Sequence, residues 1–216
     1  MIRRLTMLVL SVVVVLSLGL AAGAQEFWNY NVFPYQYERF RYEVVNYRTE
    51  WDWELEEDVV VENKQYQFLE LRRVDDQTME VTQGSTQLMS MEGLSDNLTF
   101  LGGLMGLSAL MSGGDWFGEL WLLGMWAADL ELEVGNNMQM FDGSRVRVVE
   151  ETSVAGVRGY LLRKFVRETD ESGNRVDITK SEWVVAPDVG WPLALTMFSE
   201  EGDVVYRMTL VEYERK

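Results

Sequence analysis

Short runs in which apolar and polar residues alternate fill most of the chain from Phe40 to Glu214. Phe40, Tyr42 and Val44 are apolar with charged residues between them, and the phase of the alternation changes at Val44–Val45. A period of two residues is typical of an antiparallel strand with one buried and one solvated face. The change of phase indicates a β-bulge or a strand end.

About ten such strands are expected, and short turns rich in Gly, Asn and Asp separate them. The expected ranges are 40–55, 58–62, 65–74, 78–82, 130–134, 145–150, 157–168, 175–186, 193–198 and 204–214. Turns between consecutive strands favour an antiparallel meander, and a sheet of this many strands is expected to curve.

Residues 98–128 depart from the alternating pattern, since they contain only two charged residues, Asp115 and Glu119. The sequence Ser112-Gly113-Gly114-Asp115 divides this segment into 98–111 and 116–128. Each half is shorter than the roughly 20 apolar residues that a bilayer crossing needs. We therefore expect one or two short helices, apolar on nearly every side, that cover the concave face of the sheet.

Three roles for this apolar segment stay open: a fixed plug of the core, a movable lid over a lipid-sized cavity, and a hairpin that dips into a membrane. Seven of the twelve methionines lie in or near it, and Met adapts to apolar partners of varied shape, which slightly favours the lid. The candidate lipid-binding residues are large apolar side chains of the segment: Leu101, Leu104, Met105, Leu107, Met111, Trp116, Phe117, Leu120, Trp121 and Met125.

The first 24 residues have the pattern of a secretory signal peptide. Arg3 and Arg4 precede an uncharged apolar run, and Ala22-Gly23-Ala24 matches the small-residue pattern before a cleavage site. An uncleaved membrane anchor is the alternative. Cleavage predicts a periplasmic or secreted protein with one domain, residues 25–216, that contains the apolar segment 98–128 as an insert.

The charge and composition exclude several functions. Without Arg3 and Arg4 the chain has 17 basic against 35 acidic residues, a net charge of −18, and this charge repels nucleic acids. The chain contains no His and no Cys, which excludes Ser-His and Cys-His catalysis and an ordinary zinc site. Adjacent acids such as Glu56-Glu57 point to opposite faces of a strand and do not form a glycosidase pair. We expect no enzyme activity, no cofactor and no metal.

The C-terminal region resembles a known family. Residues 183–193, WVVAPDVGWPL, lead through a strand and the acidic turn Ser199–Asp203 to Val204–Tyr213. This arrangement is similar to the end of bacterial outer-membrane lipoprotein-sorting proteins, the periplasmic lipoprotein-carrier superfamily. The resemblance covers about 40 residues and implies an incomplete antiparallel β-barrel that holds acyl chains on its concave face.

The sequence thus predicts an α+β fold, mainly antiparallel β, in which a half-open barrel of about ten strands is covered by one or two apolar helices. The expected function is to carry a lipid or an acylated protein without covalent chemistry. The alternative is a periplasmic regulatory or envelope-assembly domain of the same fold that acts through a protein partner. Transient contact with a membrane is compatible with either function.

Overall fold

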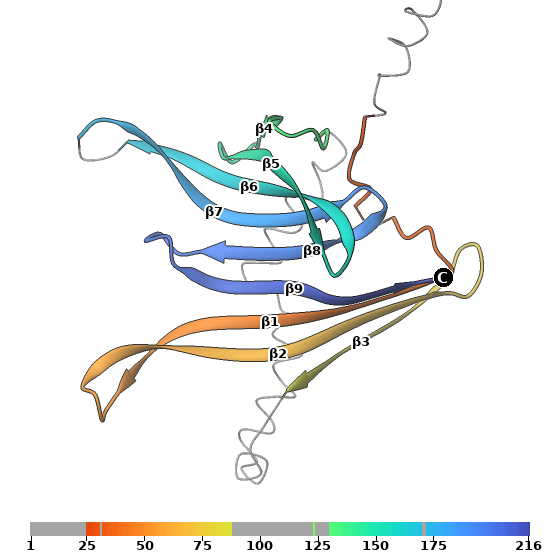
Figure 1. Cartoon of the computed structure of the whole chain (residues 1–216), viewed down its shortest axis with the longest axis horizontal. Coiled ribbons are helices and arrows are strands. Elements are labelled where there is room, and N and C mark those ends of the chain that lie inside the picture. Colours follow the sequence, from red (N-terminus) through yellow and green to blue (C-terminus); the bar gives the residue numbers. More distant parts are fainter. Residues whose placement is uncertain (1–24, 31, 88–122, 124–129, 170–171) are drawn as a thin grey trace, which may run out of the picture.

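An antiparallel sheet of nine strands makes up most of what the computed structural model describes, namely residues 25–30, 32–87, 123, 130–169 and 172–216. The strands lie in the order β3-β2-β1-β9-β8-β7-β6-β5-β4 (Figure 1). Their bounds are β1 (Tyr37–Asp52), β2 (Glu57–Arg73), β3 (Met79–Gln87), β4 (Asn137–Gln139), β5 (Arg145–Val154), β6 (Val157–Thr169), β7 (Arg175–Ala186), β8 (Val189–Phe198) and β9 (Val204–Arg215).

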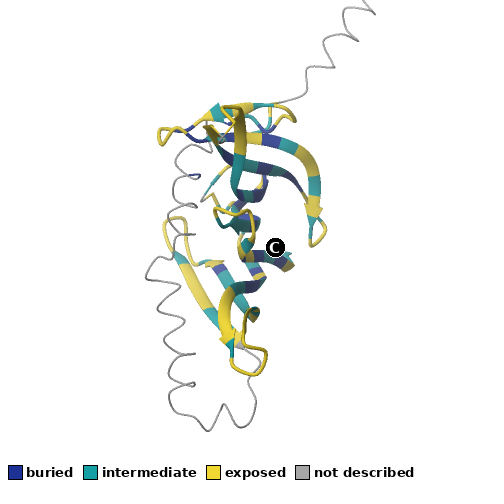
Figure 2. Cartoon of the chain, turned by 90° about the vertical axis from the view of Figure 1, so that its left-hand side faces the viewer, coloured by how far each residue is buried: buried dark blue, intermediate teal, exposed yellow. Residues whose placement is uncertain are grey.

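Two runs of consecutive hairpins meet in the middle of this sheet. Strands β1 to β3 form one run, β4 to β9 form the other, and β9 pairs with β1 along Glu38–Asn46. The sheet is not closed, because β3 and β4 are its two opposite edges. It is nevertheless strongly bent (Figure 2), and register shifts such as the one between Lys164 and Phe165 add to the local twist.

The predicted α+β fold class is wrong. The described residues form an all-β, open sheet of nine strands, and they contain no helix that covers a concave face. The expected helices fall in 98–128, of which only Leu123 is described. Their prediction rested on the length and hydrophobicity of two short apolar runs, and such runs do not by themselves distinguish a helix from other buried structure.

Several predicted strand ends also differ from the structure. β2 continues through Glu62-Asn63-Lys64, where a turn was expected, because Asn63 pairs with Asn46 of β1. Residues 130–134 form no strand, and only an isolated bridge joins Glu131 to Phe27. The register shift of β1 against β9 lies between Arg41 and Tyr42 rather than at Val44–Val45. In β1 and β2, pairing between strands overrides the local preference for a turn or a bulge, whereas residues 130–134 alternate in sequence but lack a strand partner beyond this one bridge.

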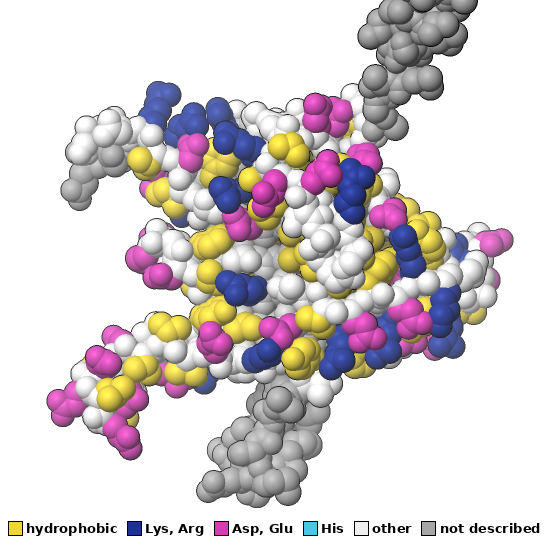
Figure 3. Space-filling model, in the orientation of Figure 1, with side chains coloured by type: hydrophobic (Ala, Val, Ile, Leu, Met, Phe, Trp, Pro, Cys, Tyr) yellow, Lys and Arg dark blue, Asp and Glu magenta, His cyan; other side chains and the backbone are white. Residues whose placement is uncertain are grey.

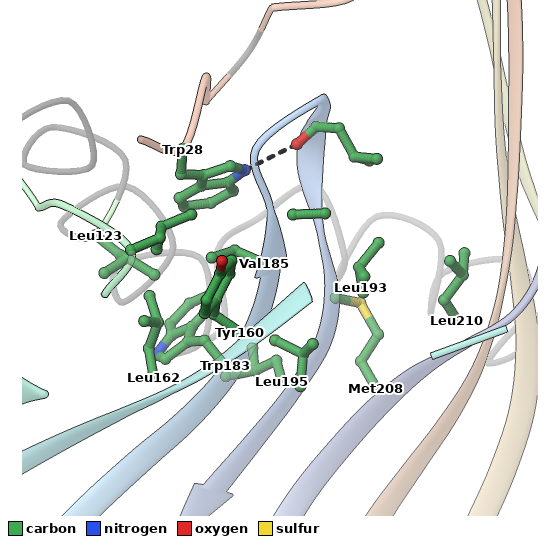
Figure 4. Close-up of a cluster of buried hydrophobic side chains, with 14 of the residues drawn as sticks. Trp28, Leu123, Tyr160, Leu162, Trp183, Val185, Leu193, Leu195, Met208 and Leu210 are labelled. Atoms are coloured by element: carbon green, nitrogen blue, oxygen red, sulfur yellow. Dashed lines mark hydrogen bonds between the residues drawn. The ribbon is translucent and has the colours of Figure 1, made fainter. Parts of the chain in front are cut away.

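The core lies on one face of the sheet, which we call the inner face. It is formed by alternate residues of the five central strands β1 and β6 to β9, and Figure 4 shows several of them side by side. The buried side chains that define it are Phe40, Tyr42, Val44, Leu162, Trp183, Val185, Leu193, Leu195, Met208 and Leu210. Leu130, Leu132 and Met140, between β3 and β5, belong to the same core.

An N-terminal arm, residues 25–30 and 32–36, packs against the β7–β8 hairpin. The indole Nε1 of Trp28 donates a hydrogen bond to the carbonyl oxygen of Val189 over 2.8 Å (Figure 4). Asn29 Nδ2 donates to the carbonyl oxygen of Pro187 over 2.7 Å. A Cβ at Gly190 would lie only 2.4 Å from the carbonyl oxygen of Val32, so this glycine permits the close approach of the arm.

Candidate functional site

The centre of the inner face was the expected place for an acyl chain, and it is filled by the protein's own side chains. The exposed fraction is 0% for Phe40 and 1% for both Trp183 and Leu195. A side chain that lines an open cavity keeps accessible surface, and these keep almost none. Tyr42, also buried, donates its hydroxyl hydrogen to the carbonyl oxygen of Pro192 over 2.9 Å, which satisfies the polar group at this depth.

The ten candidate lipid-binding residues lie outside the described residues. They are Leu101, Leu104, Met105, Leu107, Met111, Trp116, Phe117, Leu120, Trp121 and Met125. Leu123, from the same apolar segment, is 3% exposed and belongs to the core cluster. Figure 4 places it beside Trp28 and Leu162. The choice between plug and lid for the whole segment stays a prediction.

A polar cleft lies where β9 ends, and we call it the rim cleft. Its volume is about 560 Å³, and it is lined by Ala155, Gly156, Val157, Arg158, Asp188, Tyr213, Glu214 and Arg215. The β5–β6 turn supplies one wall. Ala155 and Gly156 both have positive φ, 49° and 79°, as a two-residue hairpin turn requires. The sheet bends so far that β5 approaches β9, and this bend brings the turn to the end of β9.

Oppositely charged side chains line the rim cleft. Arg215 Nη1 lies 2.5 Å from Asp188 Oδ2, and both side chains are about half exposed. The Arg215 guanidinium also lies over the ring of Tyr35, 4.7 Å from the centroid, a favourable cation–π geometry. Water reaches these groups, so the ion pair contributes little to stability. Arg215 and Asp188 can therefore separate and pair with charged groups of a bound molecule instead.

A buried carboxylate lies beside the rim cleft. Glu38 is 1% exposed, and the Tyr213 hydroxyl donates to its Oε1 over 2.7 Å. Its other oxygen, Oε2, is buried without a hydrogen-bond partner. Burial raises the pKa of Glu38 and outweighs the opposing effects of Tyr213 and Arg215. The pKa of Tyr213 is also raised, first by burial and then by its hydrogen bond to Glu38.

A second polar cleft, of about 540 Å³, lies on the other side of Arg158 and is bounded by Glu26, residues 131–134 and Tyr160. Arg158 Nη2 donates to the Tyr160 hydroxyl over 2.8 Å, and that hydroxyl donates to Glu26 Oε2 over 2.5 Å. The hydrogen bond to Glu26 raises the pKa of Tyr160. Arg158 Nε donates to Glu151 over 3.2 Å, so Arg158 separates two clefts with mixed charge.

The face opposite the inner face, which we call the outer face, is charged. Arg163 Nε donates to Glu182 over 2.8 Å and Arg167 Nε to Asp177 over 2.7 Å. The hydrogen bond with Arg167 lowers the pKa of Asp177 despite a small opposing effect of desolvation. Cross-strand pairs of this kind are typical of a solvated sheet surface.

The polar clefts hold charge pairs, Arg215 with Asp188 in one and Arg158 with Glu26 in the other. Among the residues described, no group of three or more acidic side chains is placed to hold a metal ion. Within the same residues, no helix is long and apolar enough to span a bilayer. The alternating pattern did not indicate the rim cleft, since Asp188 and Arg215 are 27 residues apart and each looks like an ordinary surface position.

No family model and no curated protein matches the chain. Solved structures that resemble it include MucB in complex with MucA(peri), at 15% identity and a TM-score of 0.30, where the match covers 83% of this chain and 50% of MucB. The Pseudomonas aeruginosa MucA/MucB complex matches at 11% identity and a TM-score of 0.29, where the match covers 82% of this chain and 51% of the matched chain. An exported protein with a YmcC-like fold from Bacteroides fragilis matches at 9% identity and a TM-score of 0.32, where the match covers 89% of this chain and 100% of that protein.

The chain thus spans about half the length of the MucB chain that it matches. Identities and scores this low assign neither a function nor a family. Membership of the lipoprotein-sorting family stays a prediction from the C-terminal residues.

Proposed function

We propose that this chain is an exported protein that acts by binding a partner protein in the cell envelope. The observation that carries the proposal is the filled centre of the inner face, where Phe40, Trp183, Leu195 and Leu210 are at most 2% exposed. A lipid carrier needs apolar surface that an acyl chain can reach. The rim cleft and the second cleft beside Arg158, by contrast, are lined mainly by polar and charged groups.

The energetic comparison favours a protein partner. An acyl chain gains about 0.8 kcal/mol for each CH₂ group that it buries. To reach the inner face it must first displace side chains whose own burial contributes about 1.5–3 kcal/mol each. Replacing one apolar contact by another yields little net free energy, so the packed face provides no strong drive for lipid uptake.

The rim cleft has the size and the chemistry for a short polar segment of a partner. Its volume of about 560 Å³ falls within the range of roughly 300–1,000 Å³ that is usual for ligand sites. Arg158 and Arg215 can pair with acidic groups of the partner, while Asp188 and Glu214 can pair with basic ones. Export is inferred from the expected signal peptide, residues 1–24, which lie outside the described residues.

Two measurements on the purified mature chain test the proposal. Mass spectrometry of an organic extract should find no acyl lipid in stoichiometric amount. A photo-crosslinking residue in place of Val157, which lines the rim cleft, should capture one protein from envelope extracts. Arg215→Ala should then weaken binding of that purified protein about tenfold, because a charged contact is lost. Arg175→Ala, an exposed arginine at the start of β7, is the matched control and should bind like the wild type.

Stoichiometric acyl lipid in the extract would overturn the proposal in favour of the carrier function. A crosslinked protein that binds wild type and Arg215→Ala equally well would refute the role of the rim cleft. Thermal unfolding of each variant separates loss of binding from loss of folding.

A further inference from the structure

The β1–β2 hairpin projects beyond the strands that flank it (Figure 1). β9 pairs with β1 only as far as Asn46, and the described part of β3, which ends at Gln87, pairs with β2 from Gln65 onward. Among the described strands, residues 47–62 therefore pair only with each other, from Tyr47–Glu62 to Asp52–Glu57. A two-stranded ribbon of this kind buries little of its own surface.

Large apolar side chains are exposed at the end of this ribbon, which we call the hairpin tip, residues 50–58. The exposed fraction is 86% for Trp53, 61% for Leu55 and 48% for Trp51. The two indole rings pack edge to face, with centroids 6.2 Å apart and an interplanar angle of 79°. Tryptophan is usually well buried, and it is the residue type most enriched among the energetically dominant positions of protein interfaces.

The conformation of the hairpin tip is set by its own hydrogen bonds. Asp52 Oδ1 accepts from the backbone amide of Glu54 over 2.8 Å and from that of Leu55 over 3.1 Å. Glu56, with φ of 52°, takes the left-handed conformation that returns the chain into β2. A loop held in this way loses less conformational entropy when it binds, and this preorganisation favours affinity.

The charge around these side chains indicates the kind of surface that they meet. Six acidic residues lie within 50–58: Glu50, Asp52, Glu54, Glu56, Glu57 and Asp58. Arg48, the arginine nearest to the tip in the sequence, is paired with Glu50. Figure 3 shows acidic side chains gathered around apolar ones at this projecting end. Anionic lipid headgroups would be repelled, and the Lys and Arg residues that usually accompany tryptophan at a membrane surface are absent from the tip.

We propose that the hairpin tip docks into an apolar groove flanked by Lys and Arg on a partner protein. Two tryptophans and a leucine bury several hundred Å² at most, since an aromatic side chain buries about 150–250 Å². A stable interface needs roughly 800 Å² from each partner, so the tip is the anchor of a larger contact. The inference rests on the proposed function in one respect only, that the partner is a protein. The hairpin tip and the rim cleft lie at opposite ends of β1, so each of them can be tested separately.

Photo-crosslinking on the full mature chain tests this inference, with the reactive residue in place of Trp53. The matched control is the same residue in place of Phe141, an aromatic side chain of the β4–β5 turn that is 64% exposed. In envelope extracts, position 53 should capture one protein that position 141 does not capture. That protein, once purified, should bind Trp53→Ala about 30-fold more weakly than wild type, the loss typical of a dominant interface residue.

A variant with reduced charge tests separately whether Lys and Arg flank the partner's groove. The combined substitution Glu54→Gln, Glu57→Gln and Asp58→Asn should slow association with the captured protein about tenfold at low salt and have little effect at high salt. All of these side chains are exposed, so thermal unfolding should match that of the wild type. Capture of lipid alone or of a second copy of the chain, or equal affinity of Trp53→Ala and wild type, would refute the inference.

The two proposals fail in different ways. If Arg215→Ala weakens binding of the captured protein and Trp53→Ala does not, the hairpin tip is not an anchor and the proposed function stands. If position 53 captures no protein and stoichiometric acyl lipid is extracted, both the inference and the proposed function are wrong.

Discussion

Replacing Leu195 by alanine tests whether the centre of the inner face is as tightly packed as its burial indicates. Leu195 is 1% exposed, and it pairs with Trp183 of β7 and Met208 of β9. The substitution removes three buried carbon groups, worth about 0.8 kcal/mol each by transfer. Neighbours held in the middle of a sheet collapse poorly into the space, and this adds a cavity term. We expect a loss of about 3–4 kcal/mol in the free energy of unfolding.

Urea and thermal denaturation of the purified mature chain measure this loss. For a domain of this size, about 3 kcal/mol corresponds to a fall in Tm of roughly 6–12 °C. Val81→Ala on the edge strand β3, where Val81 is 57% exposed, is the control and should change stability by less than about 0.5 kcal/mol. If Leu195 instead lined an open lipid cavity, its truncation would cost less than about 1 kcal/mol, and that result would refute the packed inner face.

Two further substitutions test the surroundings of this core. Burial raises the pKa of Glu38 above its ordinary value, so the folded state holds this proton more tightly than the unfolded state does. The protonated carboxyl therefore adds to the free energy of unfolding below the unfolded pKa, and this contribution is lost as pH rises through the folded pKa. Urea unfolding should therefore show Glu38→Gln gaining stability relative to wild type as pH rises from about 4 to 7, and a pH-independent difference would contradict this. Gly190→Ala places a Cβ 2.4 Å from the Val32 carbonyl oxygen and should destabilise the chain by about 1–3 kcal/mol. Limited proteolysis should then cut within residues 25–36 sooner than in wild type, and unchanged protection would show that the arm is not held at Gly190.

The polar clefts could not have been found from the sequence. Arg158, Asp188 and Arg215 come from three different turns or strand ends, and each lies in or beside an alternating stretch in which a charged residue is expected on the solvated side. The bend that brings the β5–β6 turn to the end of β9 depends on register shifts along several strands. A register shift depends on the partner strand, and none of these shifts coincides with the change of phase at Val44–Val45. The exposed hairpin tip could not be found either, because Trp51, Trp53 and Leu55 lie within the expected strand 40–55, and alternation of this kind predicts a buried apolar face.

What the sequence determined by itself is the local pattern. Alternation of apolar and charged residues predicts antiparallel strands because side chains on a strand point to opposite faces, and the described residues are indeed a sheet joined largely by short turns. The absence of His and Cys determined which catalytic groups the chain lacks. The tertiary structure alone decided which strands are central, since β9 pairs with β1 across most of the chain's length. It also decided that the centre of the inner face is filled and that the tryptophans at 51 and 53 are exposed. Burial depends on neighbours brought together from distant parts of the chain, and no local pattern specifies those neighbours.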